Sequence, residues 1–195
     1  MKMSGKFDII NVVDVEATCW DTPRGVPPEW MISEIIEVGI TQLNINTFER
    51  SERESILIKP EQSDVSEFCT KLTGWTWDDL KDAGNYQDAV DVLKKKYRSP
   101  QYIWGSWGDY DRKAFEKMSK LFDVKYPFGP THLNIKALFS LVQGLKRGYG
   151  MEKAFELMGW DMDGVHHKGC DDAWNTARLM AWILSAMKRG AILPT

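Results

Sequence analysis

The N-terminal third of the chain shows the hydrophobic patterns of β-strands. Phe7–Val15 is a run of β-branched and apolar residues typical of a buried strand, and Glu34–Leu43 and Glu52–Pro60 have the pattern of two more. Between the first two runs, Trp20–Trp30 is rich in proline and glycine, which indicates a loop. We therefore expect the chain to open with three neighbouring antiparallel strands.

Helical patterns dominate the rest of the chain, with one further strand predicted over Gln101–Trp107. Gly74 is placed to end the first helix, and Thr76 with Asp79 predicts a capping box at the start of the second. The predicted helices cover Ser66–Gly74, a segment from Thr76, Gln87–Tyr97, Asp109–Phe122, His132–Leu145, Met151–Gly159 and Asp171–Arg189. This order predicts one α/β domain over residues 1–195, with a mixed sheet and helices on its faces.

Composition narrows the class of protein. The net charge is -3, which argues against a protein that holds nucleic acid by a basic surface alone, because such affinity comes from clustered Lys and Arg. An enzyme that binds phosphate through bound cations remains allowed.

No segment has the length and apolar character of a signal peptide or a membrane span. We expect no membrane association.

The three cysteines are Cys19, Cys69 and Cys170, far apart in the chain and in no CxxC pair. This spacing indicates neither a disulfide framework nor a thiolate zinc site. A reducing compartment fits, and we expect a cytoplasmic protein.

Two carboxylates stand at the end of the first strand. Asp14 and Glu16 are two residues apart, so on a strand they project from the same face. Paired like charges at the end of a buried strand are unfavourable unless a cation or hydrogen-bond donors neutralise them. The alternative is that the strand ends at Val13 and that both acids are solvated.

A third candidate carboxylate lies in SWGDYDRKAF, where two aspartates compete. Asp111 precedes Ala114 and Phe115 by three and four residues, so it begins the inward face of the helix. Asp109 precedes polar positions and suits an N-cap. We therefore take Asp111 as the functional carboxylate.

Two histidines and two aspartates surround one cysteine in HHKGCDD, residues 166–172. Asp172 lies beside the start of the apolar stripe of the last helix, and His167 falls in the loop before it, with Gly169 a plausible boundary. Asp171 and Asp172 can also be simple first-turn acids that complement the helix dipole. A nucleophilic role for Cys170 would need an activating environment, which nothing in the sequence marks.

The motifs DVEAT, the Asp111 region and His167 with Asp172 resemble the three motifs of the DEDDh exonucleases, a superfamily with an RNase H-like fold. Longer strings resemble its branch of enhanced-RNAi and histone-mRNA 3′-end exonucleases and their bacterial relatives. In order along residues 7 to about 185, these strings are DVEATCW, EIIEVG, FCTKLTG, SWGDYDR, HLNIKALF and HHKGCDDAWNTAR.

The resemblance implies an α/β fold with a mixed five-stranded sheet and metal-dependent 3′-5′ exonuclease activity on single-stranded or 3′-overhanging nucleic acid. RNA is the favoured substrate, DNA is allowed, and the products are nucleoside 5′-monophosphates. Two divalent cations, Mg²⁺ or Mn²⁺, would be bound by Asp14, Glu16, Asp111 and Asp172, which offer the hard oxygen ligands that such ions prefer.

In the same family pattern, His167 would take the proton from the attacking water. Counting five residues back from Asp172 gives His167, whereas counting from Asp171 gives His166; the match of Asp172 and Asn175 to the family string favours His167. His166 and Asp171 are then left without a chemical role. The family positions also suggest that Ala17 and Thr18 lend backbone donors to the terminal nucleotide.

Aromatic and basic residues near the motifs are candidates for contact with a strand. Four of the nine tryptophans lie in loops or beside motifs and can stack on bases, although core packing is the commoner fate of an aromatic: Trp20, Trp75, Trp77 and Trp107. Basic candidates, each more commonly a solvated surface charge, are Lys71, Arg112, Arg147 and Lys168.

A catalytically silent nucleic-acid-binding module is the alternative function. Such a module typically lacks one or more of the acids, but here every acid and the histidine are in place.

Overall fold

A five-stranded mixed sheet forms the centre of the computed structural model, which describes residues 5–22 and 31–190. The strand order is β3-β2-β1-β4-β5; β1, β2 and β3 pair antiparallel, whereas β4 and β5 pair parallel to β1 and to each other. The strands are β1 (Ile9–Ala17), β2 (Ile35–Asn44), β3 (Arg50–Leu57), β4 (Ile103–Ser106) and β5 (His132–Asn134).

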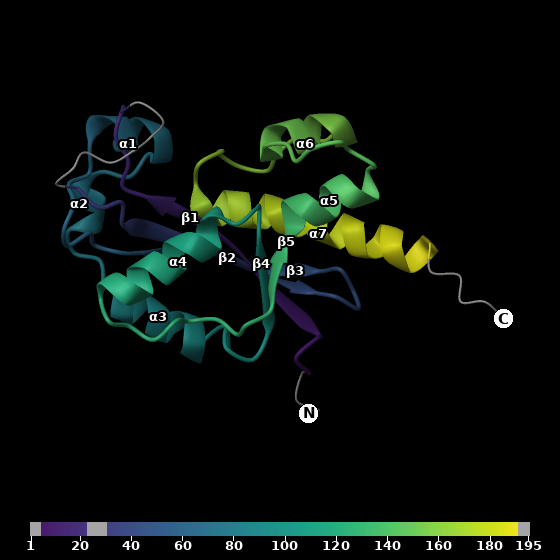
Figure 1. Ribbon diagram of the computed structural model, residues 1–195, viewed down its shortest axis with the longest axis horizontal. Helices are drawn as coiled ribbons and strands as arrows, with labels where there is room; N and C mark the ends of the chain where they lie inside the picture. Colours follow the sequence, from purple (N-terminus) through teal and green to yellow (C-terminus); the bar gives the residue numbers. More distant parts are fainter. Residues whose placement is uncertain (1–4, 23–30, 191–195) are drawn as a thin grey trace.

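Seven helices are described around this sheet (Figure 1). They are α1 (Glu67–Thr73), α2 (Trp77–Leu80), α3 (Tyr86–Lys95), α4 (Tyr110–Leu121), α5 (Ile135–Val142), α6 (Met151–Met158) and α7 (Gly169–Gly190). Within the described ranges, no helix combines the length and apolar character needed to cross a lipid bilayer. The antiparallel opening meander and the mixed α/β class predicted from the sequence are confirmed.

Alternation along β1 divides the core between the two faces of the sheet. Val13 and Val15 pack with α3 and α4 on one face, whereas Ile10 and Val12 pack with α5, α6 and α7 on the other. Because side chains alternate between faces along a strand, Asp14 and Glu16 project from the same face as Ile10 and Val12. The sequence pattern therefore places both acids on the face of the sheet that α7 covers. Figure 1 shows α7 lying along the sheet.

Local signals in the sequence account for several helix ends. The Ser66 hydroxyl accepts from the Cys69 amide at the start of α1, and Gly74 ends that helix in the left-handed conformation. Thr76 and Asp79 form the predicted capping box of α2.

The prediction of one helix over His132–Leu145 is wrong at its start. His132–Asn134 forms β5, which pairs with β4 at the edge of the sheet, and α5 begins only at Ile135. The Asn134 side chain accepts from the Ala137 amide and so caps α5. Three residues are too few to show strand periodicity, so the neighbouring strand decides this segment. The loop predicted over Trp20–Trp30 lies outside the described residues for positions 23–30.

Candidate active site

The C-terminal end of β1 carries the first two candidate ligands. Asp14 and Glu16 lie within the strand, which runs on to Ala17, so the alternative that the strand ends at Val13 is wrong. Glu16 is buried, and Asp14 is partly buried. A register shift between Glu16 and Ala17 marks the point where β1 leaves regular pairing with β2.

Asp111 reaches β1 from α4. It lies in the first turn of that helix, is buried, and accepts a hydrogen bond from the Val15 backbone N–H through Oδ1 at 3.0 Å. Val15 stands between the two acids of β1, so this bond brings the third carboxylate to them. The predicted inward orientation of Asp111 is confirmed.

Asp109 occupies the N-cap position of α4, but its side chain makes no capping hydrogen bond, so this part of the prediction needs correction. Its carboxylate instead accepts from the Asn134 side-chain amide at 3.1 Å. Asn134 ends β5 at the adjacent edge of the sheet, a neighbour that the linear sequence does not reveal.

Asp172 completes the group from the first turn of α7 and is also buried. Ligand oxygens of Asp14, Glu16 and Asp172 lie within 4.8 Å of one another. Asp172 also accepts from the His167 backbone N–H at 3.0 Å. The fold therefore gathers carboxylates from β1, α4 and α7 at one place.

The two histidines differ from the sequence expectation. The sequence left His166 without a role, but its Nδ1 lies 2.8 and 3.1 Å from the two carboxylate oxygens of Asp172. The rings of His166 and His167 stack, with centroids 4.0 Å apart. His167 has a φ of 65°, a left-handed conformation that costs energy for a residue with a side chain. Both rings line the same cavity as the acids.

Asp171, in contrast, faces away from the acids. It forms an ion pair with Arg53 at 2.6 Å and accepts from the Val165 backbone N–H at 2.8 Å. These bonds tie β3 and the preceding loop to the start of α7. The division between Asp171 and Asp172 predicted from the sequence matches this geometry.

The acids and histidines line a cavity of about 370 Å³. Its walls come from β1, α1, α4, α6, α7 and the loops beside them. The lining residues are Asp14, Val15, Glu16, Ala17, Cys19, Leu72, Trp107, Tyr110, Asp111, Gly150, Met151, His166, His167 and Asp172.

Burial and mutual repulsion shift the acids toward their protonated forms. Burial raises the pKa of Asp14 well above its usual range, and Asp111 and Glu16 add to the rise. Burial and then the charge of Glu37 raise the pKa of Glu16 to about 9. Burial also raises the pKa of Asp172, and it raises the pKa of Asp111 to about 6 against the hydrogen bond from Val15 N–H.

These carboxylates fit divalent cations. Crowded acids in a low-dielectric site bind protons or positive ions, because either removes their repulsion. The donors are all oxygen, which suits Mg²⁺ or Mn²⁺ better than softer ions. The chemistry of the donor set therefore agrees with a divalent metal centre.

Of the candidate substrate contacts, Ala17 and Trp107 line this cavity. The Trp107 indole N–H donates to the Tyr149 carbonyl, which fixes the ring. Thr18 needs correction: it is fully buried, and its backbone N–H already donates to the Glu34 carbonyl at 2.8 Å. A backbone donor is therefore not available there. Trp20 is partly buried and is not among the residues that line the cavity.

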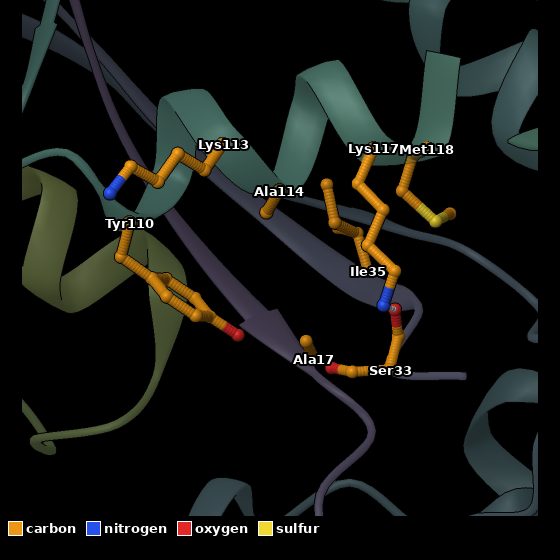
Figure 2. A pocket seen from close by; sticks show the side chains of 8 residues that line it. All are labelled: Ala17, Ser33, Ile35, Tyr110, Lys113, Ala114, Lys117 and Met118. Carbon is orange, nitrogen blue, oxygen red and sulfur yellow. Dashed lines mark hydrogen bonds between the residues drawn. The ribbon is translucent and has the colours of Figure 1, made fainter. Parts of the chain in front are cut away.

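A second cavity of about 280 Å³ adjoins the first and shares Ala17 and Tyr110 with it. Figure 2 shows the Tyr110 ring extending across it from α4, with Lys117 reaching Ser33; Lys117 Nζ donates to the Ser33 carbonyl at 3.2 Å. No carboxylate is among the residues described as lining it. The candidate metal chemistry therefore belongs to the first cavity.

The four basic candidates contact either an acidic or an aromatic side chain. Arg112 forms an ion pair with Glu116 at 2.8 Å, and Lys71 lies 3.9 Å from Glu67 on the surface. Lys168 Nζ lies 3.5 Å from the centroid of the Trp75 ring. Arg147 lies over the Tyr149 ring at 5.0 Å.

Sequence reasoning missed Lys136, whose positive charge opposes the rise in the pKa of Asp111. It also missed Glu37, the fully buried second glutamate of EIIEVG. A charged residue inside an apolar strand is the signal that could have identified Glu37.

The environment of Cys170 does not support thiol chemistry at this residue. All three cysteines are free, and burial raises the pKa of the Cys170 thiol above its usual value. A thiol activated for attack would have a lowered pKa. The sequence alternative of a Cys170 nucleophile is therefore not favoured.

Comparison with known proteins places this geometry in context. The family described as Exonuclease (RNase_T) matches residues 12–180. The 3′-5′ exoribonuclease 1 of Homo sapiens is 31% identical over 188 residues, which cover 91% of this chain and 53% of that protein. The 3′-5′ exonuclease Snipper of Drosophila melanogaster is 36% identical over 196 residues, covering 89% of this chain and 68% of that protein. The chain thus spans about half the length of the human relative.

Solved structures show the same fold. The nuclease domain of 3′hExo, described as a DEDDh family member bound to rAMP, superposes with a TM-score of 0.82 at 30% identity, covering 91% of this chain and 92% of that chain. A structure described as 3′-end specific recognition of histone mRNA stem-loop by 3′-exonuclease gives a TM-score of 0.81 at 30% identity, covering 93% and 84%. The expected RNase H-like fold with a mixed five-stranded sheet is confirmed.

Proposed function

The chain belongs to the exonuclease family, in the DEDDh branch of its 3′-5′ exoribonuclease relatives, and from this premise we propose that it is a divalent-cation-dependent 3′-5′ exonuclease. Its substrate is the 3′ end of single-stranded or 3′-overhanging nucleic acid. RNA is favoured, because the human relative is named an exoribonuclease and one similar structure is described as recognising a histone mRNA stem-loop. DNA remains a substrate to be tested. The proposal takes residues 1–195 as one exonuclease domain.

The observation that carries the proposal is the convergence of four carboxylates in one cavity. Asp14, Glu16 and Asp172 place ligand oxygens within 4.8 Å of one another, and Asp111 is held beside Asp14 and Glu16 through the Val15 amide. We assign two divalent cations to these four acids. When bound, such cations supply an activated water and stabilise the charge on the leaving oxygen.

His167 is the proposed general base. Burial lowers its pKa, so the imidazole is neutral near physiological pH and can accept a proton. In the proposed reaction, a water oxygen attacks the terminal phosphorus and the P–O3′ bond breaks. His167 takes a proton from the water, and the 3′ oxygen of the shortened strand leaves and takes up a proton from solvent to become a hydroxyl. A nucleoside 5′-monophosphate is released.

His166 is the competing assignment because its ring is hydrogen-bonded to Asp172. His167 also lines the cavity, and no hydrogen bond joins its ring to a carboxylate of the described residues, which favours it as the proton acceptor. Comparing His167→Ala with His166→Ala tests the choice. We expect the His167 variant to lose about 10²- to 10⁴-fold in kcat and the His166 variant to lose less.

The function is tested with 5′-labelled single-stranded RNA and DNA oligomers of one sequence, incubated with Mg²⁺ or with EDTA. We expect a ladder that shortens from the 3′ end only with Mg²⁺, 5′-monophosphate products, and no ladder with Asp14→Asn. Equal shortening in EDTA and in the Asp14 variant would refute the proposal. Binding of both oligomers without shortening would support the catalytically silent alternative, which the complete set of acids and histidine disfavours.

Location is a separate proposal. The three cysteines are free, which fits a reducing compartment, and we propose the cytoplasm. Fractionation of cells that express the chain tests this directly.

A further inference from the structure

Glu37 is a fifth carboxylate beside the candidate active site, and it differs from the other four. It stands on β2 directly opposite Glu16 and is fully buried. Its oxygens accept from four donors: the Ser55 hydroxyl, the Trp75 indole N–H at 2.6 Å, and the backbone N–H groups of Gly169 at 3.0 Å and Cys170 at 3.2 Å. A buried carboxylate with this many donors has its charge compensated by the protein itself.

Two of these donors belong to the start of α7. The first N–H groups of a helix have no partner inside the helix, so a carboxylate placed there caps them and interacts favourably with the helix dipole. Glu37 does this from a neighbouring strand. The backbones are also in direct contact, because a Cβ added at Gly39 would lie 1.9 Å from the Gly169 carbonyl group.

A third donor extends the anchor to the loop before α7. Trp75 donates to Glu37 through its indole N–H, and the face of its ring holds the Lys168 ammonium at 3.5 Å. Lys168 directly follows His167, whose left-handed backbone must be maintained by its surroundings. Both residues that follow His167 are therefore held by the Glu37–Trp75 pair.

We propose that Glu37 is a positioning residue for the exonuclease reaction: together with Trp75 it fixes the start of α7 and thereby sets His167 and Asp172 relative to the acids of β1. The inference rests on the proposed function. Glu37 itself touches neither substrate nor cation, since its oxygens are engaged by protein donors.

The chain offers a matched control in Glu34. This glutamate directly precedes β2, is 1% exposed, and accepts from the Glu61 and Gln62 backbone N–H groups and from the Ser63 hydroxyl. It thus resembles Glu37 in burial and accepts three hydrogen bonds where Glu37 accepts four, but none of its side-chain bonds described here reaches α7. Comparing Glu37→Gln with Glu34→Gln separates positioning of the catalytic residues from the general cost of removing a buried charge.

Steady-state kinetics on a 5′-labelled RNA oligomer provide the first readout. We expect Glu37→Gln to lower kcat by roughly 10- to 100-fold with a smaller change in KM, and Glu34→Gln to retain kcat at a similar loss of melting temperature. Adding Glu37→Gln to His167→Ala should cost less than Glu37→Gln costs alone, because the part of the effect that passes through His167 is already lost, and only the part that passes through Asp172 remains. Unchanged kcat in Glu37→Gln, an equal loss in Glu34→Gln, or fully additive losses with His167→Ala would each overturn the inference.

A second readout does not depend on activity. Hydrogen exchange of the Gly169 and Cys170 amides should accelerate in Glu37→Gln and not in Glu34→Gln; unchanged exchange would overturn the inference even if the RNA assay failed. If the unmodified chain shows no Mg²⁺-dependent shortening, the proposed function fails on its own. If Glu37→Gln does not fold, Trp75→Phe keeps an aromatic ring but removes the indole N–H donor together with the pyrrole part of the ring, and we expect a several-fold fall in kcat. Wild-type kcat in that variant would refute the anchor.

Discussion

Divalent cations should bind this protein more tightly as the pH rises, because the proposed ligands hold protons when no cation is present. Burial and the neighbouring charges of Glu37 and Asp172 raise the pKa of Glu16 to about 9. Glu16 is therefore protonated at pH 7, and a cation that uses its carboxylate must displace that proton. The pKa of Asp14 is raised as well, so Glu16 sets a lower limit on the number of protons released.

The size of the effect follows from one displaced proton. The apparent dissociation constant then falls about tenfold for each pH unit below the pKa of the ligand, so it should fall by about 100-fold between pH 6 and pH 8. Below about pH 6, Asp111 adds a second proton, because its pKa is raised to about 6. The pH dependence should steepen there.

Isothermal titration calorimetry with Mn²⁺ at pH 6, 7 and 8 measures this dependence. Running each titration in two buffers of different ionisation enthalpy counts the protons released. Glu16→Gln should flatten the curve, because the amide has no proton to lose. Equal dissociation constants at pH 6 and pH 8, with no dependence of the enthalpy on the buffer, would refute the reasoning.

The same shifts predict the sign of the change in stability. Between about pH 4.5 and pH 9, Glu16 keeps its proton in the folded chain but loses it in the unfolded chain. The unfolded state then binds fewer protons, so this group lowers the free energy of unfolding as the pH rises through that window. Mg²⁺ should therefore raise the melting temperature more at pH 8 than at pH 5, and the reverse order would contradict the assignment.

Three further predictions concern the scaffold. Gly39→Ala would place a Cβ 1.9 Å from the Gly169 backbone. We therefore expect the free energy of unfolding measured in urea to fall by about 1–3 kcal/mol, and kcat to fall as well. Wild-type values of both would show that β2 and α7 are not in contact. Thr18→Val should lower the free energy of unfolding by about 1–3 kcal/mol, because the Thr18 hydroxyl is hydrogen-bonded to Ser63 and to the Glu34 amide. We expect KM for RNA to stay unchanged. A raised KM would restore Thr18 as a substrate contact. Phe115→Ala should cost about 3–5 kcal/mol, since the ring is fully buried against Trp104 and Phe128, and a loss below about 1 kcal/mol would be inconsistent with this packing.

Several parts of the site were predictable because they depend on local spacing. A separation of two on a strand places Asp14 and Glu16 on one face, and spacings of three and four on a helix turn Asp111 inward. The capping box of Thr76 and Asp79 follows from the same kind of rule. The roles of these acids as metal ligands stay predictions until the experiments above are done.

Other features failed prediction because their pairings follow no local spacing rule. The Thr18 amide donates to the carbonyl of Glu34, which directly precedes β2, and His166 bonds Asp172 across a loop. The three residues of β5 form a strand because they pair with β4. None of these pairings has a periodic signal.

The sequence by itself determined which residues are the candidates for the chemistry, because alternation, helical spacing and motif order can be followed in the order of residues along the chain. Only the tertiary structure decided how those residues are held. Glu37 bonds the Gly169 amide across 132 positions, and the helix start that it caps carries Asp172. A buried charge must find its donors wherever the fold brings them, so this anchor became visible only when β2 and α7 were seen together.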